Sequence, residues 1–138
     1  MAEAEPAAKL YTPTLLALSV ELAEFPHDPN AAIQGRASSR TCGSEVVLSA
    51  SNEQLGQLGL RVAACAVGQA AAALFAACAT GQDRVSLTAQ LEALENWLTR
   101  QGDAPDIPRI ELIEPARDYP ARHAAIVLPW RAALDALA

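Results

Sequence analysis

The stretch SEVVLSASNEQLGQLGLRVAACAVGQAAAALFAACATG, residues 44–81, decides the fold class of this chain. Residues 45–51 alternate apolar with polar side chains, which is typical of a strand. Residues 58–64 predict a second strand, joined to the first by a short turn. Residues 66–80 are rich in alanine and predict a helix that ends at Gly81. A hairpin that leads directly into a helix indicates an α+β fold.

The sequence on either side of this hairpin predicts helices and one long loop. Thr12 and Pro13 predict the start of a leucine-rich helix, because Thr suits the N-cap and Pro the first helical position. Residues 26–40 are polar and rich in turn-forming residues, so we expect a surface loop there. Residues 86–100 have a clear apolar stripe and predict an amphipathic helix capped by Ser86.

A last helix is expected over residues 121–138, and Pro129 inside it should kink or split that helix. The order of elements predicts an α+β domain, with a small antiparallel sheet of about three strands and helices packed on one face. The 138 residues fit one domain, which we place at residues 10–138, after a flexible N-terminal tail at residues 1–9.

The composition argues against several classes of protein. The formal net charge of −6 argues against binding nucleic acid, which needs a basic surface. Although 51% of the residues are hydrophobic, no run reaches the ~18–20 uninterrupted apolar residues of a membrane span. The three cysteines lack the spacing of a secreted disulfide framework and favour the reducing cytoplasm. Sequence motifs of phosphate-binding loops, dinucleotide-binding folds and zinc proteases are absent.

Two of the cysteines have settings that suit chemistry. Cys42 precedes Gly43 in a predicted turn, and Cys65 lies where the second strand becomes the alanine-rich helix. We expect the hairpin to bring both thiols to one end of the sheet, where they form a candidate site for a soft metal or for sulfur. Because amide groups at a helix start attract negative charge, Cys65 is also a candidate reactive thiolate. The alternative is a small buried apolar residue, which is the role we expect for Cys78.

Four blocks of the sequence follow one another in a recognisable order, and they are His27-Asp28-Pro29-Asn30, Thr41-Cys42-Gly43-Ser44, Cys65-Ala66-Val67-Gly68-Gln69-Ala70, and the segment from Ala121-Arg122-His123 to Leu128-Pro129-Trp130. In this order and spacing they resemble the iron–sulfur cluster assembly scaffolds of the IscU, SufU and NifU N-terminal type. The resemblance extends over residues 10–138 and implies the fold of that family.

The resemblance also implies a set of ligands for a metal or a cluster. Cys42 and Cys65 match the first two cysteines of the family. The aspartate position of the family is Ser44 here, which is a poor ligand, and the third cysteine position falls on Ala125. His123 lies two residues before that position and is a candidate third ligand. Three ligands with an open position suit transient holding of a metal better than a structural site.

From these residues we expect a non-enzymatic, scaffold-like protein that transiently holds iron, zinc, sulfur or a nascent iron–sulfur cluster at Cys42 and Cys65, with His123 and then Ser44 as further candidate ligands. The resemblance implies a cysteine desulfurase as sulfur donor and apo-proteins as recipients, with neither nucleic acid nor membrane as a partner. Two alternatives stay open. One is a metal-free interaction or regulatory module on the same fold, and the other is a persulfide relay that needs a single thiolate.

Overall fold

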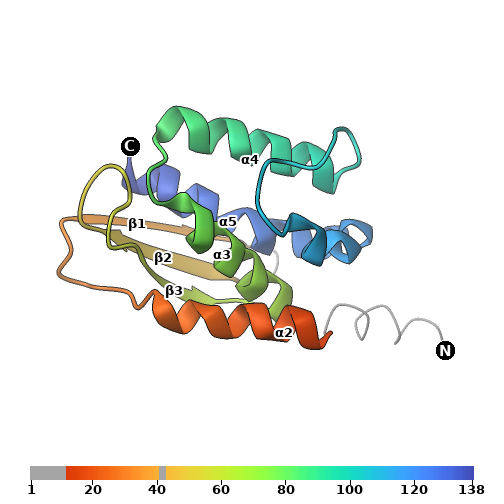
Figure 1. Cartoon of the computed structure of the whole chain (residues 1–138), viewed down its shortest axis with the longest axis horizontal. Coiled ribbons are helices and arrows are strands. Elements are labelled where there is room, and N and C mark those ends of the chain that lie inside the picture. Colours follow the sequence, from red (N-terminus) through yellow and green to blue (C-terminus); the bar gives the residue numbers. More distant parts are fainter. Residues whose placement is uncertain (1–11, 41–42) are drawn as a thin grey trace.

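The computed structural model describes residues 12–40 and 43–138, so the tail expected at residues 1–9 lies outside the described part. A three-stranded antiparallel sheet is packed against helices, which confirms the expected α+β class (Figure 1). The elements, in chain order, are α2 (Pro13–Val20), the 3-10 helix η2 (Glu21–Glu24), β1 (Ile33–Ser38), β2 (Glu45–Ala50), β3 (Gly59–Ala63), α3 (Ala66–Ala79), α4 (Arg84–Leu98), the 3-10 helix η3 (Ile110–Asp118) and α5 (Pro120–Ala136).

The sheet has one face in the core and one face open to solvent. Its order is β1-β2-β3, and both neighbouring pairs are antiparallel. Gly35, Leu48 and Leu60 lie opposite one another in the register, and all three are buried. One position further along, Arg36, Val47 and Arg61 lie opposite one another, and both arginines are exposed. This alternation is the expected pattern for an antiparallel sheet that packs against helices on one side.

Strand β1 corrects the sequence analysis, which assigned residues 26–40 to a loop. Its sequence is IQGRAS, which has a glycine at the centre and little alternation of apolar and polar residues. The strand nevertheless forms because β2 pairs with it and α5 contacts it. On its outer edge, the Arg36 N–H donates to an Asp135 carboxylate oxygen of α5 at 2.9 Å. Tertiary contacts, rather than local propensity, therefore determine this strand.

The helix starts follow the expected capping chemistry, with one correction. The Thr12 hydroxyl oxygen accepts a hydrogen bond from the Leu15 N–H at 3.1 Å, which confirms the predicted start of α2. Helix α4 begins at Arg84, so Ser86 is not its N-cap. Asp83 is the cap, because its carboxylate accepts from the Ser86 N–H at 2.9 Å while the Ser86 hydroxyl accepts from the Asp83 N–H at 3.1 Å. This reciprocal pair is a capping box.

Helix α5 is the central element of the packing, since it contacts β1, β2, α3, α4 and η3. It runs as one helix through Pro129, so the expected split does not occur. Pro129 lacks only the N–H that would donate to the Ala125 carbonyl. Contacts between the buried side chains of α5 and its neighbours keep the rest of the helix intact. Trp130 fixes the helix on two sides. Its ring meets Phe75 of α3 edge-on at 5.2 Å, and its indole N–H donates to Gln90 of α4 at 2.7 Å.

We predict that Gly35→Ala destabilises the protein by at least about 2 kcal/mol, because the new methyl group forces β1 and α5 apart. A Cβ at this position would lie 2.3 Å from the Ala132 carbonyl oxygen and 2.6 Å from the Ala136 Cβ. Gly102→Ala is the matched control, since its Cβ would lie 3.4 Å from the Asn96 Cβ. Urea unfolding followed by circular dichroism measures both, and equal losses for the two variants would contradict this account.

A second prediction concerns the ion pair between Arg109 and Glu21, which ties η3 to η2 through two hydrogen bonds of 3.0 and 3.1 Å. The hydrogen bond from Arg109 lowers the pKa of Glu21 below its usual value of 4.5. A lowered pKa gives stability that is present above the usual value and is lost as the pH falls through the folded value. Glu21→Gln should therefore cost about 0.2–1 kcal/mol at neutral pH, because both side chains are partly exposed.

Unfolding free energies of wild type and Glu21→Gln, measured from neutral pH down to acid, should converge below pH 4.5, where the Glu21 carboxylate becomes protonated. High salt should narrow the difference at neutral pH, because it screens exposed charges. A difference that persists unchanged in acid would show that the ion pair is not its cause.

Candidate functional site

The candidate site lies at the end of the sheet where β1 ends, β2 begins and β3 leads into α3. Ser38, Glu45 and Ala63 are opposite one another in the register at this end. The structure thus brings the β1–β2 connection and the strand–helix corner to the same place, as the hairpin predicted. Cys42 itself lies outside the described residues, so its predicted role stays a prediction.

Gly43, the first described residue after that gap, has a backbone conformation that costs little only for glycine. Its φ is +70°, in the left-handed region that favours glycine. Its N–H donates to the Ser39 carbonyl at 3.0 Å, and the Ser39 N–H donates to the Ser44 carbonyl at 2.9 Å. Ser44 is only 4% exposed, so this candidate ligand faces the interior of the fold.

Cys65 occupies the corner between β3 and α3, where it is the N-cap residue of the helix. Its backbone is extended, with φ −64° and ψ 170°, and its side chain makes no capping hydrogen bond. The residue is half-buried and belongs to no disulfide. A thiol that is neither capping the helix nor fully enclosed is available for chemistry.

The position expected for the third cysteine lies beside this corner and is filled by alanine. Ala125 is 1% exposed, and a Cβ on Gly68 of α3 would lie 3.2 Å from the Ala125 Cβ. Gly68 is three residues after Cys65 and therefore lies on the same side of α3. The N-terminal halves of α3 and α5 thus meet where the resemblance places a ligand, but this chain offers a methyl group there.

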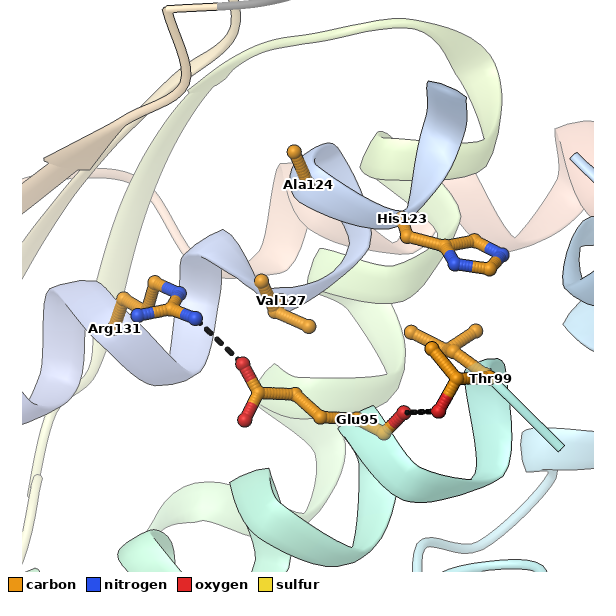
Figure 2. A pocket seen from close by; sticks show the side chains of 7 residues that line it. Glu95, Thr99, His123, Ala124, Val127 and Arg131 are labelled. Atoms are coloured by element: carbon orange, nitrogen blue, oxygen red, sulfur yellow. Dashed lines mark hydrogen bonds and ion pairs between the residues drawn. The ribbon is translucent and has the colours of Figure 1, made fainter. Parts of the chain in front are cut away.

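His123 points to a different part of the molecule. Residues 123 and 125 are about 200° apart around a helix, so a side chain at 123 projects away from the Gly68 contact. The His123 Nε2 lies 3.0 Å from the Ala116 carbonyl oxygen. Its ring lines a cavity of about 240 Å³ between α4 and α5, near Thr99 and the ion pair of Glu95 with Arg131 (Figure 2).

Within residues 12–40 and 43–138, no group of three or more His, Cys, Asp or Glu side chains is arranged to hold a metal ion. Of the candidate residues that this part contains, Cys65 alone has both a soft donor atom and an accessible position. The assignments of His123 and Ser44 as ligands stay predictions. Among the described candidate residues, the soft donor is therefore the half-buried Cys65 thiol.

Cys78 lies near the other end of α3 and packs against the hydrophobic core, as expected. Burial, and to a smaller extent the negative charge of Asp106, raises the pKa of the Cys78 thiol. Cys65 and Cys78 are thirteen positions apart in the sequence, which places them about 20 Å apart along the helix. The two described thiols therefore act independently.

One residue of the site has no role in the sequence analysis. The side-chain amide of Gln69 donates to the Ala64 carbonyl at 3.1 Å, immediately before Cys65. The only signal in the sequence for this role is that a polar residue, Gln69, follows Cys65 by one helical turn. Its partner, however, is a backbone carbonyl, which a sequence pattern does not show.

Among the described residues, no helix is both long enough and apolar enough to span a membrane. No protein-family model matches the sequence, and no curated protein matches it. Solved structures do match. The N-terminal part of a nitrogen-fixing NifU-like protein from Brucella abortus is 27% identical, with a TM-score of 0.79 over 95% of this chain and 94% of that one.

A second match is the protein assigned as the iron–sulfur cluster assembly scaffold for the SUF system of Fervidobacterium islandicum AW-1. It is 19% identical, with a TM-score of 0.76 over 94% of this chain and 98% of that one. Both similarities extend over nearly the whole of both chains. The protein therefore has the fold of the NifU N-terminal and SufU type, and the resemblance inferred from its sequence is confirmed by its structure.

We predict that iodoacetamide alkylates Cys65 several-fold faster than Cys78 in the native protein near pH 8. Both thiols are half-buried, but desolvation raises the pKa of Cys78, which leaves less of its reactive thiolate at this pH. Mass spectrometry of the peptides at increasing reaction times gives both rates. In denaturant the two rates should converge, and equal rates in the native protein would contradict the prediction.

Proposed function

We propose that this chain is a non-enzymatic, scaffold-like protein of iron–sulfur cluster assembly. It transiently holds iron, zinc, sulfur or a nascent cluster at Cys42 and Cys65 and passes this cargo to a recipient. The observation that carries the proposal is Cys65, a half-buried thiol at the strand–helix corner of a NifU- and SufU-type fold, with no hydrogen bond that occupies it as a helix cap.

The described ligand set favours labile rather than permanent binding. Zinc and iron–sulfur sites take about four soft or borderline ligands. Ala125 contributes none, and Ser44 is buried. Cys42 and Cys65 together supply two thiolates, which leaves positions for water, sulfide or a side chain from a partner. A site that needs outside donors releases its cargo more readily than a closed site.

The proposed partners follow from this incomplete site. A cysteine desulfurase supplies sulfur as a persulfide, and an apo-protein receives the product. In the transfer step, the Cys65 thiolate attacks the outer sulfur of the donor persulfide. A new S–S bond forms on Cys65, the S–S bond of the donor breaks, and the donor cysteine leaves as a thiolate. The reducing cytoplasm is the compartment that keeps such thiols available.

A metal-free interaction module on the same fold is the second candidate. The buried Ala125 favours it, because a methyl group stands where the resemblance places a ligand. The two functions differ in whether Cys42 and Cys65 bind anything at all.

The test is the metal content of protein purified without oxygen, for wild type, Cys42→Ala, Cys65→Ala and the matched control Cys78→Ala. We expect zinc or iron in the wild type and in Cys78→Ala, and loss of the metal in the other two variants. Ala125→Cys adds a third thiolate beside Cys65 and should slow metal release to a chelator. Absence of metal from the wild type, together with failure of Cys65 to accept persulfide sulfur, would refute the scaffold role and favour the interaction module.

A further inference from the structure

The corner that carries Cys65 is held by a single residue one turn further along α3. The backbone N–H of Gln69 donates to the Cys65 carbonyl at 2.9 Å, as the first helical hydrogen bond. Its side-chain Nε2 donates to the preceding carbonyl, that of Ala64, at 3.1 Å, in a part-buried position. Gln69 therefore fixes two consecutive carbonyl groups, one on each side of the Cys65 backbone N–H and Cα.

This arrangement replaces the usual one at a helix start. An N-cap side chain normally accepts a hydrogen bond from an amide of the first turn, which turns that side chain back over the helix. Cys65 makes no such bond, and the peptide before it is fixed by Gln69 instead. The direction of the Cys65 thiol is thus set by the backbone that carries it, and the thiol makes no hydrogen bond to the amides of the first helical turn.

Packing supports the same corner. A Cβ on Gly68 would lie 2.8 Å from the Ala64 Cβ and 3.2 Å from the Ala125 Cβ, so the three residues are in close contact. The Ala64–Cys65 peptide is therefore supported both by the Gln69 hydrogen bond and by close packing of Ala64 against Gly68. Such support restricts the directions in which the Cys65 side chain can leave the backbone.

We propose that Gln69 is the positioning residue of Cys65, which sets the direction of its thiol for accepting sulfur or metal. This inference rests on the proposed function and deepens it. Gln69 touches no cargo. It acts through the Ala64 carbonyl, and its effect on function is that of orienting a group before the reaction, which lowers the cost of reaching the reactive geometry.

The test compares Gln69→Met with Gln82→Met. Met keeps the length of Gln without its donor, and Gln82 is matched because its Nε2 donates to the Cys78 carbonyl at 2.8 Å, at the far end of the same helix. Iodoacetamide alkylation of each cysteine, Cd²⁺ affinity as a probe of soft-ligand binding, and urea unfolding are measured for each variant. In Gln69→Met the half-buried Cys65 side chain is no longer held in one direction, so a small reagent reaches it more often and its alkylation relative to Cys78 should rise about threefold to tenfold. Cd²⁺ affinity, which needs the thiol in one defined direction, should fall by a similar factor.

Gln82→Met should leave Cys65 alkylation and Cd²⁺ affinity as in the wild type. Unchanged Cys65 chemistry in Gln69→Met would overturn the proposal, and so would equal acceleration of both cysteines, which indicates general loosening of the fold. If the wild type binds no Cd²⁺ but the alkylation ratio still shifts in Gln69→Met alone, the positioning role stands and metal holding by Cys42 and Cys65 fails. The two hypotheses are thus separable.

Discussion

The close approach of α5 to two other elements is the constraint on which the rest of the structure depends. At Gly35 the helix backbone comes so near to β1 that a side chain would meet the Ala132 carbonyl, and at Gly68 the same helix meets the start of α3. Both approaches need a glycine on one side and alanine on the other. This explains why a chain that is 51% hydrophobic contains only 4% aromatic residues. Small side chains let backbones pack directly, with dispersion contacts in place of bulky interlocking groups.

The same constraint shapes the candidate site. Helix α5 reaches the start of α3 where Ala125 meets Gly68, three residues after Cys65, yet an alanine there has no donor atom. His123 lies two residues before Ala125, so its side chain projects from another side of α5, where it lines the cavity between α4 and α5. The chain therefore keeps the geometry of a scaffold fold while offering fewer ligands, which is why cargo held here would depend on donors from outside the described residues.

Some of the sequence-based predictions were correct because the signals were local. Thr12 starts α2 by a hydrogen bond to an amide three residues on, and the hairpin strands alternate buried and more exposed residues over part of their length. Other predictions failed, for two different reasons. Ser86 has the residue type of an N-cap, but Asp83, three residues earlier, accepts the Ser86 N–H and starts the helix before it, which is again a local effect. Pro129 should interrupt a helix, but burial of α5 on several sides preserves it.

The sequence by itself determined the α+β class, the resemblance to cluster-assembly scaffolds, and the places of Cys65 and Ala125 in it, because these depend on residue type and spacing along the chain. Only the tertiary structure decided that residues 33–38 form the edge strand, that His123 faces α4, and that Gln69 holds the Ala64 carbonyl. Each of these three depends on partners that lie elsewhere in the chain or on backbone atoms. A pattern of side chains does not encode such partners until the fold brings them together.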